Sequence, residues 1–158
     1  MTRLSLTQAR EFGIIPKNKQ KNAAVKKSKS AATWDVELVL SGVVFTIPEN
    51  MPSLNEWKNW HWSKQAEYKQ FLTDALSILA LKAGKPKYEK AKIKVVHCFR
   101  VNRRRDEDNL TPKFLLDALR YAGVIAEDHA EVLQLMPPII EVDSVRWRTE
   151  IYIVESKE

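Results

Sequence analysis

The hydrophobic pattern of the chain changes period several times, and it predicts strands and helices in alternation. Residues 34–47 are rich in β-branched and aliphatic side chains around Ser41-Gly42. They predict either a hairpin or one long strand bent at the glycine. Alternating apolar and polar residues over 92–100 predict a strand with one buried face. Two further strands are expected over 130–136 and 144–154.

Two helices are predicted between these strands. Apolar residues recur at helical spacing over 64–82, and Ser53-Leu54-Asn55-Glu56 ahead of them matches a helix capping box. A second helix is expected over 111–122, with Thr111 as N-cap, Pro112 in the first turn and Gly123 just after its end. The order of elements predicts a small two-layer α/β (α+β) domain, with a mixed sheet and two helices on one of its faces.

Composition excludes several classes of protein. With 44% hydrophobic residues, the chain of 158 residues is long enough to fold as one domain and is not disordered throughout. The single cysteine, Cys98, excludes a disulfide framework and a zinc site built from cysteines. The longest weakly charged stretch, 38–48, has about 11 residues, whereas a membrane span needs about 20. We therefore expect a soluble, cytoplasmic protein with no membrane association.

The net charge of +6 is unevenly distributed. Residues 1–33 contain eight of the 26 basic residues and one of the 20 acidic ones, which gives this segment +7 and leaves the remainder at −1. Because residues 17–33 are mostly Lys, Asn, Ser and Ala, they bury too little apolar surface to offset the entropy of ordering. We predict a basic, largely flexible N-terminal extension over 1–33 and a folded domain over 34–158.

Candidate chemistry lies in the polar loop that follows the strand over 92–100. Asp106 and Asp108 point to the same side if the backbone there is extended. Two such carboxylates repel unless a cation lies between them, and carboxylate oxygens suit Mg²⁺ or Mn²⁺. The neighbouring Arg103, Arg104 and Arg105 suit a phosphate-bearing substrate.

A third carboxylate, Asp128, can reach the same place. The helix over 111–122 is about 18 Å long, and residues 123–128 span about 17 Å when extended. If that segment runs back along the helix, Asp128 returns to the helix N-terminus beside Lys113. Three carboxylates of this kind are a ligand set for metal-assisted phosphodiester hydrolysis, and a nearby lysine can stabilise charge in the transition state.

Each part of this pattern has an ordinary structural interpretation. An Asp-x-Asp pair is common in solvated loops, and the three arginines can simply pair with the adjacent acids. The whole run RRRDEDNLTPKFLLDALRYAGVIAEDHAEV is more specific, and it resembles the RusA family of Holliday junction resolvases. Pro52-Ser53-Leu54-Asn55 is similar to a loop that precedes the first helix of that family, and the resemblance covers about residues 42–155.

The resemblance implies a dimeric, Mg²⁺-dependent endonuclease, bacterial or phage-encoded, that resolves four-way DNA junctions in recombination and repair. The catalytic and metal-binding aspartates of the family fall on Asp106, Asp108 and Asp128, and its catalytic lysine falls on Lys113. Relative to the family pattern, one extra residue precedes Lys113, and Glu127 occupies the first acidic position of the second motif.

Aromatic and basic residues alternate just before the first predicted helix, in Trp57, Lys58, Trp60, His61, Trp62 and Lys64. They either stack on exposed bases and bind the backbone, or pack the loop against the helix. We include Lys58, Trp60 and Lys64 with the three arginines as candidate DNA-binding residues. Two rival functions stay open: a nuclease that acts on other branched DNA or on RNA, and a junction-binding protein without catalysis.

The charge split generates a prediction for the N-terminal extension. Deleting residues 1–30 should weaken DNA binding and lower its salt dependence, because the log–log slope falls by about 0.9 for every phosphate that the protein no longer neutralises. Binding measured over a series of salt concentrations checks this. An unchanged slope would show that the extension does not contact DNA.

Overall fold

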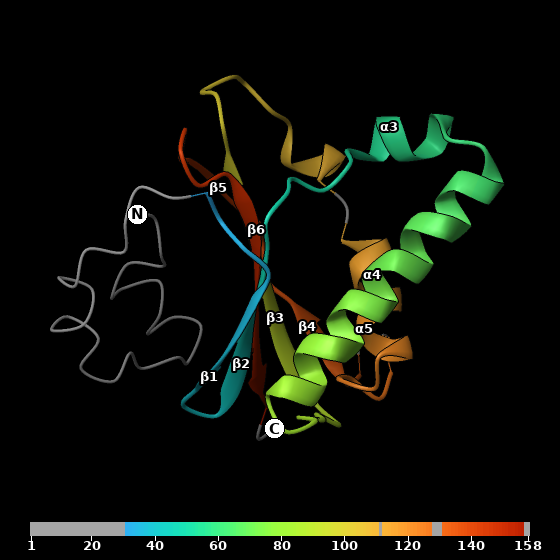
Figure 1. Cartoon of the computed structure of the whole chain (residues 1–158), viewed down its shortest axis with the longest axis vertical. Helices are drawn as coiled ribbons and strands as arrows, with labels where there is room; N and C mark the ends of the chain where they lie inside the picture. The colour runs from blue at the N-terminus through green and yellow to red at the C-terminus, as the bar shows by residue number, and fades with distance from the viewer. Residues whose placement is uncertain (1–30, 111, 128–130, 157–158) are drawn as a thin grey trace, which may run out of the picture.

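The computed structural model describes residues 31–110, 112–127 and 131–156. Within them, six strands form one mixed sheet in the order β1-β2-β6-β3-β4, with β5 also paired to β3 (Figure 1). β3 lies antiparallel to β6 but parallel to β4 and β5. The strands are β1 (Asp35–Val39), β2 (Gly42–Ile47), β3 (Ala91–Phe99), β4 (Leu133–Leu135), β5 (Ile139–Val142) and β6 (Arg148–Glu155).

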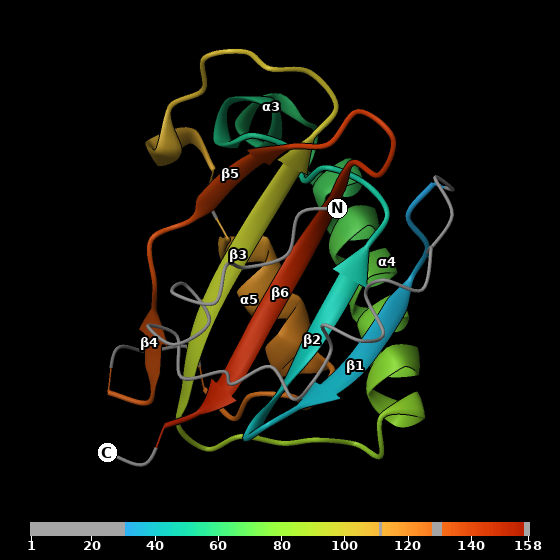
Figure 2. The ribbon, with the colours of Figure 1, turned by 90° about the vertical axis from the view of Figure 1, so that its left-hand side faces the viewer.

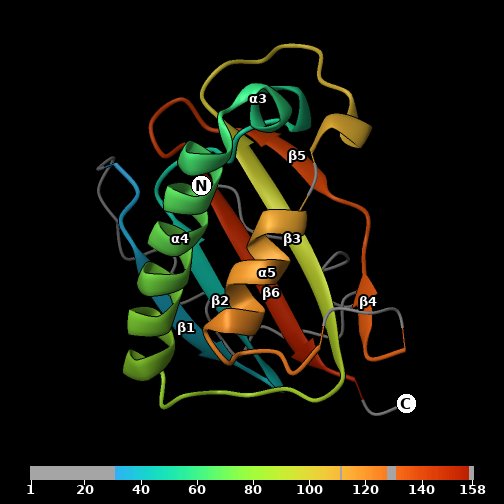
Figure 3. The same ribbon diagram turned by 90° about the vertical axis from the view of Figure 1, so that its right-hand side faces the viewer.

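The helices of the described residues are α3 (Leu54–Asn59), α4 (Trp62–Lys82) and α5 (Lys113–Tyr121). α4 and α5 cover the same face of the sheet, whereas the short α3 lies beyond its end (Figure 3). The predicted small two-layer α+β domain with two helices on one face is therefore confirmed. No helix in the described part of the chain is long and apolar enough to cross a membrane.

Residues 34–47 form a hairpin, the first of the two expected alternatives. β1 and β2 pair antiparallel with Val39 opposite Gly42, and Ser41 in the turn between them has a φ of 62°. Position 42 must be glycine because β6 leaves no room for a side chain there. A methyl group at this position would collide with the backbone carbonyl of Ile153. The glycine thus lets β2 approach the central strands closely.

Helix ends follow the expected signals with small shifts. Gly123 has a φ of 79° directly after the C-cap of α5, as the sequence predicts. α5 starts at Lys113, with Pro112 at the N-cap rather than in the first turn, while Thr111 lies outside the described residues. α4 starts two residues earlier than predicted, because His61 Nδ1 accepts a hydrogen bond from the backbone N–H of Ser63.

The C-terminal strands differ from the prediction. The sequence favours strands over 130–136 and 144–154, but the structure has β4, β5 and β6, and β5 was not predicted. Pro137 and Pro138 separate β4 from β5, which continue along the same edge of β3. β6 starts late because the Asp143 carboxylate accepts hydrogen bonds from the backbone N–H groups of Val145 and Arg146, which holds these residues in a turn.

The prediction that β3 is buried on one face only is wrong. Ile93 and Val95 pack in the main core between the sheet and the helices, but Val96 and Cys98 on the other face are equally buried. Even Lys94 is only 7% exposed. β3 lies in the middle of the sheet. An alternating sequence does not predict whether the second face of a central strand is buried.

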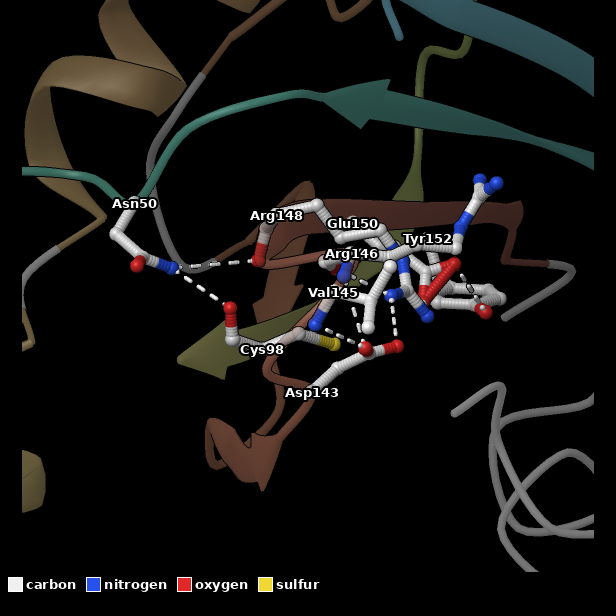
Figure 4. Close-up of polar contacts among 8 residues, drawn as sticks. All are labelled: Asn50, Cys98, Asp143, Val145, Arg146, Arg148, Glu150 and Tyr152. Carbon is white, nitrogen blue, oxygen red and sulfur yellow. Dashed lines mark hydrogen bonds and ion pairs between the residues drawn. The ribbon is translucent and has the colours of Figure 1, made fainter. Parts of the chain in front are cut away.

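A buried ion network lies on this second face (Figure 4). The Arg148 guanidinium is 3.0 Å from the Asp143 carboxylate and 3.3 Å from that of Glu150, and the Tyr152 hydroxyl donates to Glu150 over 3.2 Å. Burial alone would raise the pKa of Asp143, but hydrogen bonds from Arg146, Arg148 and Val145 hold it below its usual range. Arg148 is therefore committed to the fold.

Candidate functional site

Two segments that are distant in the sequence meet at one end of the sheet. Residues 48–55 follow β2 and residues 100–110 follow β3, and both segments leave the sheet at the same end (Figure 2). Asn50 fastens the first segment there, because its side-chain amide donates to the carbonyl of Cys98 over 2.9 Å. The hydroxyl of Thr149 adds a second link, donating to the Glu49 carbonyl over 2.9 Å.

A hollow of about 600 Å³ lies between the two segments. Arg103, Arg104 and Asp106 line it from the second segment, facing Pro52 and Ser53 from the first. An adjoining hollow brings Asp108 together with Arg104, Asp106 and Asn55. The two sequence motifs that carry the family resemblance thus share one surface, to which we refer as the cleft.

One hydrogen bond joins the two motifs directly. The side-chain carbonyl of Asn109 accepts from the backbone N–H of Asn55 over 3.1 Å, in the first turn of α3. Ser53 caps the same turn, since its hydroxyl accepts from the backbone N–H of Glu56 over 3.2 Å. The N-cap half of the predicted capping box is confirmed, the Glu56 carboxylate accepts from the Ser53 hydroxyl over 3.4 Å, and Asn109 has a structural role at the start of α3.

The backbone around the two aspartates differs from the expected extended form. Asp106 is extended, but residues Glu107–Asn109 form a 3₁₀ turn, η1, closed by a 3.0 Å hydrogen bond from the Asn109 N–H to the Asp106 carbonyl. The expectation that an extended chain orients Asp106 and Asp108 alike is therefore wrong for Asp108. Both aspartates are exposed and line the adjoining hollow all the same.

The third predicted ligand, Asp128, lies outside the described residues. The segment before it is anchored by Tyr88, whose backbone N–H donates to the Val124 carbonyl over 2.8 Å and whose carbonyl accepts from Ala126 over 3.2 Å. Tyr88 precedes β3, so this segment starts from the end of that strand opposite the cleft. Residues 123–127 of the expected return segment are described and are held beside Tyr88, so the approach of Asp128 to Lys113 stays a prediction. Among the described residues, no three His, Cys, Asp or Glu side chains are placed to hold a metal.

The three arginines divide into two kinds. Arg103 and Arg104 are exposed at the cleft. Arg105 instead supports the loop: its guanidinium donates to the carbonyls of Val101 and Arg103, each over 3.1 Å, and lies 3.7 Å from the ring centre of Phe99. Partial burial, and then the charge of Arg103, lower the pKa of Arg105. Arg105 therefore holds the loop in shape. The sequence alone did not distinguish this role from phosphate binding.

Beneath this loop, the buried His97 packs against Phe99. Its ring lies parallel to that of Phe99 at 6.0 Å. Burial lowers the pKa of His97 to about 4, and its Nδ1 has no hydrogen-bond partner among the described residues. The imidazole is therefore neutral near pH 7 and serves as a core residue.

Within the tryptophan-rich segment, the structure shows the packing alternative for Trp57 and leaves Trp60 at the cleft. Trp57 stacks on Phe114 of α5 at 4.7 Å, so it packs the helices together. Trp60 lines the cleft, with the Lys64 ammonium 4.0 Å from its ring centre. Lys58 and Lys64 are both exposed. Trp60 and Lys64 thus lie at and beside the cleft, and their binding of DNA stays a prediction.

Some of the cleft was not predicted. Glu49, Asn50, Tyr68 and Phe99 line it as well. The Tyr68 hydroxyl donates to the Glu49 carboxylate over 3.1 Å, and burial, followed by the charge of Glu49, raises the pKa of that hydroxyl. These residues belong to three different elements, and no local spacing connects them.

No protein-family model matches the chain, and no curated protein matches it either.

The division of the arginines can be tested by single substitutions. Arg105→Ala should lower the free energy of unfolding by about 1–2 kcal/mol, because it removes two hydrogen bonds and a cation–π contact. Arg103→Ala removes an exposed side chain and should change stability by less than about 0.5 kcal/mol. Urea denaturation checks both variants. Equal losses would contradict the division.

Proposed function

We propose that this protein is a Mg²⁺-dependent, structure-selective DNA endonuclease that resolves four-way junctions in recombination and repair. Two features support the proposal: the resemblance of residues 103–128 to the RusA family, and the way the chain brings the motif residues together at the cleft. With the resemblance comes the further proposal of a cytoplasmic protein, bacterial or phage-encoded, that acts as a homodimer.

The observation that carries the proposal is that the charged side chains at the cleft form no ion pairs with one another among the described residues. The ion pairs among the described residues join Lys69 or Arg120 to Asp117, Lys82 to Asp35, and Arg148 to Asp143 or Glu150. Within the described chain, none joins Arg103–Arg105 to Asp106–Asp108. Arg103, Arg104 and the two aspartates therefore lie in one loop without a direct ion pair between them, which supports their availability to external ligands.

The donor set fits a hard divalent cation. Asp106 and Asp108 line one hollow, and carboxylate oxygens are the ligands that Mg²⁺ and Mn²⁺ prefer. Asp128 is the proposed third ligand. When bound, Mg²⁺ supplies Lewis-acid polarisation of a phosphodiester and assists its attack by water.

The chain's own residues have distinct roles in this proposal. Arg103 and Arg104 hold the DNA backbone beside the aspartates through charge-assisted hydrogen bonds to phosphate oxygens. Lys113, exposed at the first position of α5, stabilises the charge that develops on the phosphate. Lys58, Trp60 and Lys64 bind an adjacent stretch of the substrate. A four-way junction needs two symmetric cuts, which suits a homodimer with a two-fold axis.

The decisive variant is Asp106→Asn, with Glu107→Gln as its matched control. Asp106→Asn should lower cleavage of a four-way junction in Mg²⁺ by at least about 100-fold, because it removes a ligand charge, while junction binding survives. Glu107→Gln removes the same charge from a neighbour that lines the same hollow but to which the resemblance assigns no role, and it should cut at close to the wild-type rate. Gel assays with radiolabelled DNA measure both steps.

The substrate panel tests selectivity. A DNA junction, a replication fork, a plain duplex, a single strand and an RNA duplex are compared under the same conditions. Cleavage by Asp106→Asn at the wild-type rate would show that the site is wrongly assigned. Equal cutting of plain duplex would overturn junction selectivity, and preferential cutting of forks or RNA would favour the rival nuclease. Binding without any cleavage would favour the non-catalytic alternative.

A further inference from the structure

The second face of the sheet, turned away from α4 and α5, is apolar at its centre and buried. Val44 of β2, Val96 of β3 and Val154 of β6 cluster there, and none of them is more than 7% exposed. Tyr152 is 5% exposed, and Lys94, which lies opposite it, is 7% exposed. Long side chains on an open sheet face stand up into solvent, so a further layer of chain must cover these two.

No described helix supplies this layer. Seen from its second face, the sheet has α4 and α5 behind it, and α3 lies beyond its end (Figure 2). The partly buried apolar residues that pack against the cluster are Val39, Met136 and Ile139, which come from β1 and from the edge formed by β4 and β5, so they flank it. The exposures are those of one chain alone, so the cover belongs to this chain and not to a partner.

The length of the remaining chain identifies the segment. The parts outside the described residues are 1–30, 111, 128–130 and 157–158. The buried patch crosses β2, β6 and β3 and runs from Arg148 to Val154 along β6, so it measures about 10 Å by about 20 Å. Stretches of one to three residues are too short to cover this area, and residues 1–30 are long enough.

Residues 1–30 also have a suitable composition and reach. Large apolar side chains occur in the first half, at Leu4, Leu6, Phe12, Ile14 and Ile15. Residues 17–30 are polar except for two alanines and Val25. The described chain begins at Ala31, just before the edge strand β1, and 14 residues span up to about 45 Å, which exceeds the width of the sheet. The first half can therefore reach the patch and bury apolar surface on it.

We propose that residues 1–16 pack over the second face of the sheet as a strap that covers Val44, Val96, Tyr152 and Val154. Residues 17–30 connect the strap to β1, and they carry six of the eight basic residues of the extension. The predicted flexibility then belongs to this connecting part. The strap does not rest on the proposed function, because the experiments that test it contain no DNA, so the two hypotheses fail separately.

The reactivity of Cys98, the only cysteine of the chain, tests the strap in solution. Its side chain belongs to the buried patch and is 0% exposed, so dithiobis(nitrobenzoate) should react with it only when the cover opens. Leu6→Ser combined with Phe12→Ser in the full chain should raise the reaction rate at least about tenfold. Gln20→Ser combined with Asn22→Ser alters the connecting part equally and should leave the rate unchanged.

Two results of this experiment would overturn the strap. One is a wild-type thiol that reacts as fast as the urea-unfolded chain does. The other is an unchanged rate both in the Leu6→Ser and Phe12→Ser variant and in a chain that lacks residues 1–30. Circular dichroism of each variant shows whether a faster reaction comes from opening of the patch or from unfolding of the domain.

A spin label tests where the strap lies. A nitroxide attached at Ser5→Cys in a Cys98→Ala background should broaden the amide signals of Val44 and Tyr152 more than that of Ser77, because α4 covers the opposite face. Spectra with the label reduced give the reference intensities. Equal or stronger broadening at Ser77, or none at Val44 and Tyr152, would overturn the proposal.

Discussion

The cleft depends on the antiparallel pairing of β6 with both of its neighbours. Because β2 and β3 each lie antiparallel to β6, they run in the same direction and end at the same edge of the sheet. Residues 48–55 and 100–110 therefore leave the sheet side by side, although about 50 residues separate them. The bond from Asn109 to Asn55 and the bond from Asn50 to Cys98 then fix two loops that the strand order has already brought together.

Charged side chains of the described residues are paired on the buried face of the sheet but unpaired at the cleft. On the buried face, Arg148 is matched by Asp143 and Glu150, because a charge removed from water is tolerated only with a partner. At the cleft, Arg103, Arg104, Asp106 and Asp108 stay in water, where an unpaired charge costs little. This difference separates the ions that hold the fold from those proposed to bind phosphate and metal.

The sequence predicts those features that depend on neighbouring residues. The Ser53 N-cap, the positive φ of Gly123 and the extent of α4 depend on local hydrogen bonding and backbone freedom, and all three can be predicted from a few neighbouring residues. The same holds for the presence of Arg103, Arg104 and Asp106 in one exposed loop.

Features that depend on distant contacts were not predictable in the same way. The burial of Val96 and Cys98 depends on the central position of β3, and the loop-shaping role of Arg105 depends on Phe99 lying beneath it. Arg148 is buried beside the carboxylates of Asp143 and Glu150, which the alternating pattern over 144–154 does not indicate. The turn at Glu107–Asn109 follows from the bonds that Asn109 makes, which no spacing in the motif specifies.

Paramagnetic broadening by Mn²⁺ tests most directly whether Asp106 and Asp108 form a metal site at the cleft. In ¹⁵N spectra of the full chain, substoichiometric Mn²⁺ should broaden the amide signals of Asp106, Asp108 and Asn109 first, and excess Mg²⁺ should restore them. Broadening confined to other carboxylates, such as Glu141 and Asp143, with the cleft unaffected, would contradict a metal site there.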